Sequence, residues 1–253
     1  MKTRAVGAEL DEYLKELHLP AIRRCYEEKA QRATQETLSY EHFLLELTEQ
    51  ECQERRAHRI ERLLKISRLP LEKTLDNFEM KRLPIKAARQ VKALADGAFL
   101  DRRENVLVFG NPGSGKTHLL SALGQELIRQ GRRATFTTCQ RLVQDLLRAK
   151  KELELNHAIK KLSYYEALVI DDIGYVQQSR EEMEVLFTLL AERYERGSVL
   201  ITSNLPFSKW EIIFKDPMTT AAAIDRLVHH SVIVELNVAS YRVEQAKQKK
   251  ADE

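Results

Sequence analysis

A glycine-rich stretch that ends in a lysine and a threonine carries the strongest chemical signal in the sequence. The stretch reads Gly110-Asn111-Pro112-Gly113-Ser114-Gly115-Lys116-Thr117 and is followed by His118. Glycine adopts backbone angles that a Cβ forbids, so successive N–H groups of such a loop can point inward and hold a phosphate. In loops of this pattern the lysine reaches the β- and γ-phosphates and the threonine hydroxyl reaches Mg²⁺. The nine residues therefore predict a binding site for ATP and Mg²⁺, in which Lys116 also assists hydrolysis.

Two adjacent carboxylates supply the acids that such a loop requires. Asp171 and Asp172 end the apolar run Ala167–Ile170. Active groups of parallel sheets gather at the carboxyl ends of strands, so Asp171 is predicted to hold Mg²⁺ and Asp172 to orient or deprotonate the attacking water. The alternative is a solvated pair of acids that opens a turn before Gly174. The phosphate-binding loop upstream favours the catalytic interpretation.

Two further polar residues are candidates for a role in hydrolysis. Asn204 follows the apolar run Val199–Thr202, where a polar side chain would lie beside the γ-phosphate. Its alternative role is that of a turn residue before Pro206. Arg226 precedes the last apolar run. One arginine among leucines is usually a surface residue, but an arginine that reaches a neighbouring subunit's γ-phosphate would stabilise the transition state.

The elements that must position these residues follow from an alternation of short apolar runs and helical stretches. The expected strands are Val106–Phe109, Ala134–Thr137, Ala167–Ile170, Val199–Thr202 and Val232–Leu236. The helices between them are expected to begin near Lys116, Gln140, Arg180 and Thr219. Upstream, Pro84 is expected to open a helix through about Ala98. This alternation predicts an α/β fold with a parallel sheet covered on both faces, and it places the glycine-rich loop between a strand and a helix, as the motif requires.

The first part of the chain has a different composition. Residues 1–68 contain a single glycine and a single proline and read as helices. An apolar stripe at helical spacing is formed by Leu10, Tyr13, Leu14 and Leu17. Pro20 is expected to end the first helix, and Ser39 can cap a long helix that runs to about Leu64. We therefore expect a small helical domain over 1–68 and an ATPase domain over 69–253.

Composition limits the remaining classes of protein. Of 253 residues 43% are hydrophobic, which suffices for a substantial core, and the net charge of +3 means that a nucleic-acid surface would need local clustering. Cys25, Cys52 and Cys139 are far apart, which favours reduced thiols in a cytoplasmic protein. No apolar run is long enough to cross a membrane, so no membrane partner is expected. His229 and His230, as neighbours in a helix, could not face one ion, so no metal besides nucleotide-bound Mg²⁺ is expected.

Basic residues cluster in the long helix. Six of them fall within fourteen positions, opposed only by Glu61: Arg55, Arg56, Arg59, Arg62, Lys65 and Arg68. Arg55, Arg59 and Arg62 share one helical face. Such a stripe can neutralise phosphates of double-stranded DNA with little sequence specificity. The alternative interpretation is that these residues only form a solvated face of the helix. A second basic cluster contains Arg148, Lys150, Lys151, Lys160 and Lys161. It could line the inner face of an oligomer, and a role as ordinary solvent-exposed surface is equally compatible with the sequence.

These residues belong to a longer pattern with a recognisable likeness. The pattern reads VIDDIGYVQQSREEMEVLFTLLAERYERGSVLITSNLPFSKW and then AAAIDRLVHHSVIVELNVASYR. It resembles the AAA+ ATPases, in the branch that contains the helicase loader DnaC and the initiator DnaA. Within that branch it is most similar to the IstB-like ATP-binding proteins, helper ATPases encoded beside the transposase of an insertion sequence. The likeness covers about residues 70–245, and YEHFLLELTEQE in the N-terminal part resembles the same family.

The resemblance implies roles for the candidate residues. The glycine-rich loop matches Walker A, Asp171 and Asp172 match the Walker B acids, Asn204 matches the first sensor, and Arg226 matches an arginine finger that acts across a subunit boundary. It also implies a five-stranded sheet of order 5-1-4-3-2, and a ring or helical homo-oligomer assembled with ATP on DNA. The implied function is to assist a cognate transposase in the selection of target DNA.

Two departures from the family pattern keep alternatives open. Most AAA+ proteins have glutamate where this chain has Asp172, so Glu181 and Glu182 are other candidates for the base. The chain ends soon after the last expected strand, which implies no full C-terminal lid and leaves Arg242 as a late sensor. The alternative functions are a DnaC-like replicative helicase loader, a small-molecule kinase, and a scaffold that binds ATP without cleaving it. The acids, Asn204 and Arg226 together favour hydrolysis over phosphoryl transfer to another molecule.

Overall fold

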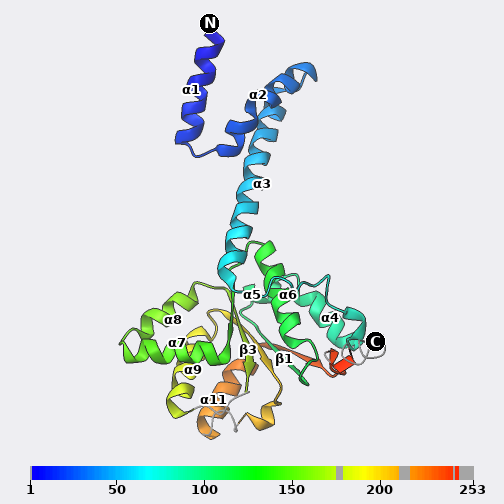
Figure 1. The fold of residues 1–253 in the computed structure, drawn as a ribbon, viewed down its shortest axis with the longest axis vertical. Coiled ribbons are helices and arrows are strands. Elements are labelled where there is room, and N and C mark those ends of the chain that lie inside the picture. The colour runs from blue at the N-terminus through cyan, green and yellow to red at the C-terminus, as the bar shows by residue number, and fades with distance from the viewer. Residues whose placement is uncertain (1, 175–178, 211–216, 242, 245–253) are drawn as a thin grey trace, which may run out of the picture. The chain divides into compact units, whose positions relative to one another are not determined.

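The computed structural model describes residues 2–174, 179–210, 217–241, 243 and 244. The chain divides into two compact units, Met1–Arg62 and Leu63–Glu253. The first unit is helical, and the second contains the sheet and the glycine-rich loop (Figure 1). Among the described residues, no helix combines the length and the apolar character needed to span a membrane.

Three helices build the first unit, and α3 continues into the second. They are α1 (Lys2–Glu16), α2 (Pro20–Gln35) and α3 (Tyr40–Ser67). Pro20 is the first residue of α2, since its fixed φ and missing N–H suit a first helical turn. The hydroxyl of Ser39 accepts a hydrogen bond from the N–H of His42 at 3.3 Å and caps α3. The expected start of α3 is therefore confirmed, and Pro20, which was expected to end the first helix, begins the second.

The apolar stripe of α1 is buried at one position. Leu14 is 7% exposed and packs against Ile22 of α2 and Leu47 of α3. The other members of the stripe are 39%, 55% and 66% exposed, and they are Leu10, Tyr13 and Leu17. The predicted stripe is therefore covered only at the position where the three helices meet.

Five parallel strands form the sheet of the second unit. They are β1 (Asn105–Gly110), β2 (Ala134–Thr138), β3 (Ala167–Ile173), β4 (Ser198–Ser203) and β5 (Ser231–Leu236). Their order is β2-β3-β4-β1-β5, and each neighbouring pair is parallel. This confirms the α/β fold and the order 5-1-4-3-2. Because all strands run the same way, the carboxyl ends of β1, β3 and β4 meet at one edge of the sheet.

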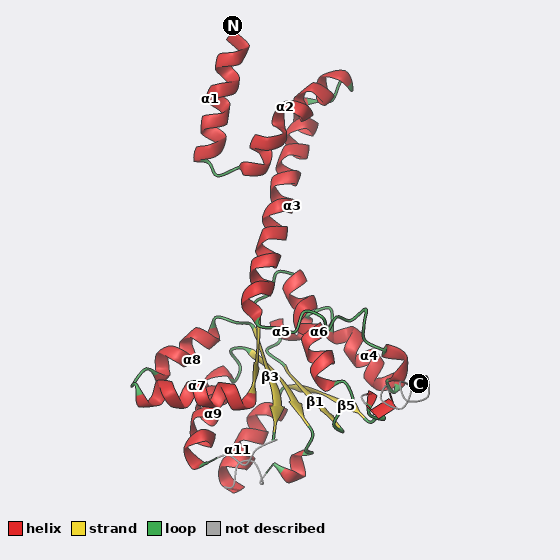
Figure 2. Ribbon diagram, in the orientation of Figure 1, coloured by secondary structure: helices red, strands yellow, loops and turns green. Residues whose placement is uncertain are grey.

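Helices cover both faces of this sheet (Figure 2). On one side lie α7 (Cys139–Lys151), α8 (Leu155–Ser163), α9 (Arg180–Arg193) and α11 (Pro217–Val228), and on the other lies α6 (Lys116–Arg129). Short 3₁₀ turns occur at Met80–Arg82 and Phe207–Lys209. The apolar residues of β1, β3 and β4 are almost completely buried between the layers.

Two expected helices differ from the observed ones. The stretch after β2 is interrupted at Leu153, whose φ of +60° ends α7 before α8 begins. The helix after Pro84, α4 (Ile85–Leu94), stops before Ala98, because Gly97 at φ +76° starts the separate short helix α5 (Ala98–Asp101). Arg242, expected as a late sensor, lies outside the described residues.

Candidate ATP-binding and hydrolysis site

The glycine-rich loop has the backbone that its sequence predicts. Gly113 and Gly115 have φ values of +81° and +95°, and Gly115 is the N-cap of α6. A side chain at Gly113 would also collide with Ser240, which follows β5. The N–H of Tyr241 donates to the carbonyl of Gly113 at 3.0 Å, so the segment after β5 is held against the loop. The positive end of α6 therefore opens onto the loop, where an anion is stabilised.

Lys116 is the first residue of α6, and its side chain reaches back to the loop that precedes the helix. Its side chain is nearly buried, with 8% of the residue exposed. The ammonium group donates to the carbonyl oxygens of Gly110 at 2.9 Å and Asn111 at 3.0 Å. These acceptors are neutral, whereas phosphate oxygens are charged and form stronger hydrogen bonds with an ammonium group. The lysine is therefore placed to exchange loop carbonyls for the phosphates of a nucleotide.

A chain of hydrogen bonds joins the loop to the Walker B acids. The hydroxyl of Thr117 lies 2.9 Å and 3.1 Å from the two carboxylate oxygens of Asp171. The hydroxyl of Thr202, on β4, donates to Asp171 at 2.7 Å and accepts from the N–H of Asp172 at 2.7 Å. The predicted magnesium ligands Thr117 and Asp171 are thus brought together. Thr202 was not foreseen as part of the site.

Asp172 occupies an irregular point at the end of β3. The register between β3 and β4 shifts between Ile170 and Ile173, and Asp172 has a φ of +65°. Such irregularities re-aim side chains next to active sites. Desolvation raises the pKa of Asp172, and so does the nearby charge of Asp171, while Lys116 acts in the opposite direction. A carboxylate with a raised pKa is a better proton acceptor, which suits a general base.

The two glutamates considered as alternative bases lie on α9. The carboxylate of Glu182 accepts from the N–H of Ser179 at 2.5 Å, while the Ser179 hydroxyl accepts from the N–H of Glu182. This capping box holds Glu182 at the start of α9. Glu181 is exposed in the first turn of the same helix. Glu182 is thus engaged at the start of its own helix, whereas the charge of Lys116 in the loop acts on Asp172, and this favours Asp172 as the base.

Asn204 and Arg226 lie in different surroundings. Asn204 follows β4 at the same sheet edge as the two acids, and its Oδ1 atom is buried without a hydrogen-bond partner among the described residues. An unpaired buried oxygen is costly, so this position suits an incoming donor such as water. Arg226, on α11, stacks over the ring of Phe187 on α9 with 4.6 Å between the guanidinium carbon and the ring centroid.

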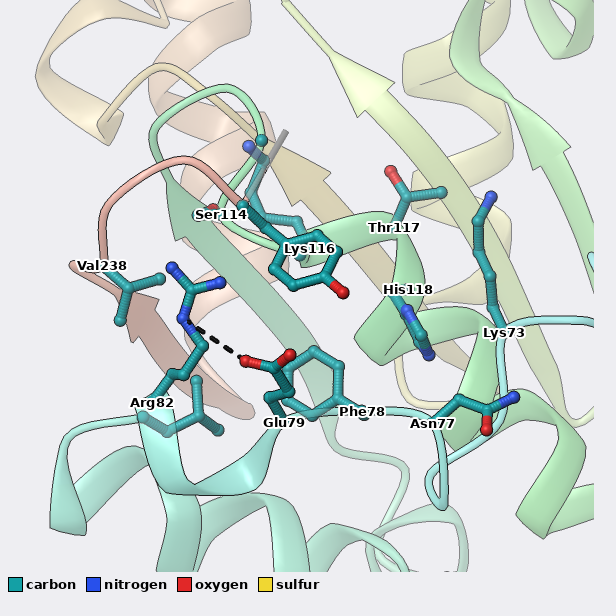
Figure 3. A pocket seen from close by; sticks show the side chains of 14 residues that line it. Lys73, Asn77, Phe78, Glu79, Arg82, Ser114, Lys116, Thr117, His118 and Val238 are labelled. Carbon is teal, nitrogen blue, oxygen red and sulfur yellow. Dashed lines mark ion pairs between the residues drawn. The ribbon is translucent and has the colours of Figure 1, made fainter. Parts of the chain in front are cut away.

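A cavity of about 300 Å³ opens beside the loop (Figure 3). Its lining combines loop residues 113–118 with the segment before α4 and the segment after β5. The ring centroids of Phe78 and His118 are 5.3 Å apart, and the guanidinium carbon of Arg82 lies 5.2 Å from the ring centroid of Tyr241. Flat apolar surfaces next to a phosphate-binding loop suit a nucleotide base. Phe78, Arg82 and Tyr241 were not foreseen, because no motif surrounds them in the sequence.

His118 reaches the segment before α4 as well as the cavity. One ring nitrogen lies 2.9 Å from the carbonyl oxygen of Thr74. The predicted nucleotide-binding residue thus joins the start of α6 to the cavity wall formed by residues 73–83. The imidazole ring therefore supports Phe78, as the contact between the two rings in Figure 3 illustrates.

All six basic residues of the predicted DNA surface are exposed. Arg55 is also used within the first unit, since it pairs with Glu51 at 2.8 Å and bonds to the carbonyl of His18. Glu51 is 4% exposed and accepts from the backbone N–H groups of Ala21 and Ile22 at the start of α2. Burial opposes the charge of Glu51, but the hydrogen bonds from Arg55 and the backbone outweigh it and lower the pKa of this carboxyl.

The sheet, the loop and the acid pair together define a P-loop protein of the AAA+ class. A crystal structure of the DnaC helicase loader matches with a TM-score of 0.55 at 19% identity, covering 65% of this chain and 96% of that one. The replication initiator DnaA bound to AMPPCP and single-stranded DNA matches with a TM-score of 0.58 at 20% identity, covering 73% of this chain and 56% of that one. At these identities the likeness concerns the fold.

The chain belongs to the family of IstB-like ATP-binding proteins, whose model matches residues 12–250. An insertion-sequence ATP-binding protein of Sinorhizobium fredii is 43% identical over 96% of this chain and 82% of its own length. The ATP-binding protein of insertion sequence IS5376 from Geobacillus stearothermophilus is 37% identical over 94% of this chain and 95% of its own length. The ATP-binding protein of insertion sequence IS21 from Pseudomonas aeruginosa is 37% identical over 94% of this chain and 90% of its own length.

Proposed function

We propose that this protein is an ATPase that assembles with ATP on double-stranded DNA and assists the transposase of an insertion sequence. The observation that carries the enzymatic part is the hydrogen-bonded chain from Thr117 through Asp171 and Thr202 to Asp172 at the mouth of the phosphate-binding loop. A scaffold that only holds ATP would have no use for a carboxylate with a raised pKa beside the γ-phosphate position.

The residues at the loop fit a bound magnesium ion. The hydroxyl of Thr117 and the carboxylate of Asp171 converge within 2.9 Å, and hard oxygen donors of this kind are what Mg²⁺ prefers. Bound there with ATP, the ion would neutralise charge on the β- and γ-phosphates. Thr202 holds Asp171 on its other side, so the orientation of the carboxylate is set by the protein.

The remaining groups act on the phosphates and on water. Lys116 stabilises negative charge on the β- and γ-phosphates, Asp172 accepts the proton of the attacking water, and the buried Oδ1 of Asn204 helps to orient that water. Arg226 supplies charge to the site of a neighbouring subunit, so that hydrolysis depends on assembly. These roles are the ones that chemistry and position support best for each side chain.

Assembly on DNA and cooperation with a transposase rest on different support. The exposed arginines of α3 provide positive charge for phosphate contacts. The relatives that are 37–43% identical are named as insertion-sequence ATP-binding proteins, which favours a transposition helper over a helicase loader. The likeness to DnaC is at the level of the fold and favours neither function.

The test is to measure phosphate release and DNA binding with the same protein preparation. We expect duplex DNA to raise ATP turnover, and ATP to strengthen DNA binding and oligomer formation compared with ADP. Lys116→Ala should abolish ATP binding and this coupling, whereas Asp172→Asn should still bind ATP but release phosphate at least about tenfold more slowly. The proposal fails if Lys116→Ala assembles on DNA with ATP as the unaltered chain does.

A further inference from the structure

Three side chains that commonly bind metal ions meet at the sheet edge opposite to the ATP site. Glu195 lies in the turn between α9 and β4, while His229 and His230 form the turn between α11 and β5. One ligand atom from each residue lies within 4.8 Å of the other two, and all three residues are exposed. The two histidines were expected to be neighbours in a helix and therefore unable to face one ion. They are not in a helix, because α11 ends at Val228.

The two turns that carry these side chains are tied together by one buried residue. Asn105, 8% exposed at the start of β1, donates its backbone N–H to the carbonyl of His230 at 2.7 Å. Its side-chain amide donates to the carbonyl of Leu227 at 3.1 Å and accepts from the N–H of Val199 on β4 at 2.9 Å. Because β1 lies between β4 and β5, Asn105 fixes the separation of the turns.

The histidine rings are also oriented by neighbours. The hydroxyl of Tyr194 lies 3.0 Å from Nδ1 of His229, and the rings of His229 and His230 contact each other with centroids 4.2 Å apart. Nε2 of His230 lies 3.9 Å from a carboxylate oxygen of Glu195. In protein metal sites, a second hydrogen bond commonly orients a ligating imidazole in the way that Tyr194 orients His229.

We propose that Glu195, His229 and His230 form a binding site for a divalent transition-metal ion of the Zn²⁺ type. Two imidazoles and one carboxylate are a ligand set that suits Zn²⁺ and its neighbours, whereas Mg²⁺ and Ca²⁺ prefer oxygen ligands throughout. Water would complete the coordination, since the cluster is exposed. The site is independent of the ATPase proposal because it lies at the other end of the strands.

A bound ion would link the turn after α9 to the turn after α11. These two helices pack against each other and carry the pair Phe187 and Arg226. An ion that binds the folded chain and not the unfolded chain raises the unfolding temperature, and the rise grows with the logarithm of the ion concentration once this exceeds the dissociation constant. We therefore expect Zn²⁺ to stabilise the ATPase unit through this edge of the sheet, with or without ATP.

The binding experiment requires the chain without a polyhistidine tag. Competition of the protein with a chromophoric chelator for Zn²⁺ should show one saturable site per chain. Glu195→Gln and His230→Gln should each weaken binding by more than about tenfold, and Tyr194→Phe, which removes only the orienting hydroxyl, by about tenfold. His157→Gln changes an exposed histidine on α8 and should bind Zn²⁺ as the unaltered chain does.

Two measurements protect this test from misfolded variants. Affinity for MgATP should be unchanged in every variant, since the loop lies at the opposite edge of the sheet. Co²⁺ bound to the unaltered chain should show the intense visible bands of a four- or five-coordinate site with nitrogen ligands. A spectrum of weak bands typical of the hydrated ion, or Zn²⁺ binding that Glu195→Gln and His230→Gln leave intact, would overturn the proposal.

Discussion

The position of Thr202 gives a sharp test of how the acid pair is organised. Thr202 is buried, with 1% of the residue exposed. Its hydroxyl forms two hydrogen bonds of 2.7 Å that link the carboxylate of Asp171 to the backbone of Asp172. Thr202→Val keeps the shape of the side chain and removes both bonds. The N–H of Asp172 would lose its partner, and among the described residues the carboxylate of Asp171 would keep only its hydrogen bonds with Thr117.

The size of the effect follows from these two bonds. A hydrogen bond to a charged group contributes about 1.5–3 kcal/mol, and an unpaired buried N–H costs about 1–3 kcal/mol. We expect a loss of about 2–4 kcal/mol in the free energy of unfolding. If about half of this restraint, about 1–2 kcal/mol, serves to hold the acids in place for hydrolysis, kcat falls by about fivefold to thirtyfold. The KM for ATP should change little, because Lys116 and the loop are untouched.

Steady-state phosphate release and urea unfolding measure the two quantities on the same protein. Thr202→Ser retains the hydroxyl and serves as the matched control, with kcat within about threefold of the unaltered chain. The reasoning is refuted if a folded Thr202→Val protein hydrolyses ATP at the unaltered rate. It is also refuted if Thr202→Ser is as slow as Thr202→Val, because the hydroxyl would then not be the group that matters.

Three further changes test other parts of the structure. Gly197→Ala would place a Cβ 2.7 Å from Nη2 of the buried Arg193. We expect urea unfolding to show a free energy of unfolding that is lower by about 1–3 kcal/mol. The effect of Gly197→Ala should be smaller when Arg193 is also replaced by methionine. The pKa of Glu51 is lowered in the folded chain, so its contribution to stability is fully present above the ordinary carboxyl pKa of about 4.3. That contribution is lost as the pH falls through the pKa of the folded state. Glu51→Gln should therefore flatten the acid dependence of thermal unfolding measured between pH 6 and about pH 3. Replacing Arg59 and Arg62 by glutamine should make the slope of log affinity for duplex DNA against log salt shallower by about 2, measured by fluorescence anisotropy; an unchanged slope would remove α3 from the DNA contact.

Much of the fold could be predicted because its signals are local. Each strand is an apolar run bounded by polar residues, and the loop Gly110–Thr117 needs only its own glycines to adopt its backbone. The strand that ends in Asp171 and Asp172 was visible as an apolar run, although β3 continues through both acids to Ile173 and not only to Ile170. The order of the strands came from the resemblance to a known family, since periodicity does not specify which strands are neighbours.

What could not be predicted depends on residues that are distant in the sequence. Thr202 contacts Asp171 because β4 lies beside β3 with a register shift at this point. Tyr241 and Phe78 meet at the cavity from opposite ends of the second unit. His229 and His230 approach Glu195 only because β5 and β4 both flank β1. In each case the sequence shows the side chain but not its neighbour.

Arg226 illustrates how the structure changes the energetics of a predicted role. Within its own chain the guanidinium stacks on Phe187, a contact that contributes about 0.5–2 kcal/mol. Its Nη1 atom, however, is buried without a hydrogen-bond partner among the described residues, and such a group costs about 1–3 kcal/mol. The two contributions nearly cancel, so moving this side chain to a phosphate of a neighbouring subunit would cost little. An arginine whose two Nη atoms donate to four carbonyl oxygens, as those of Arg193 do, would lose all four bonds on release, which is why Arg226 is better suited than Arg193 to a part in subunit contacts.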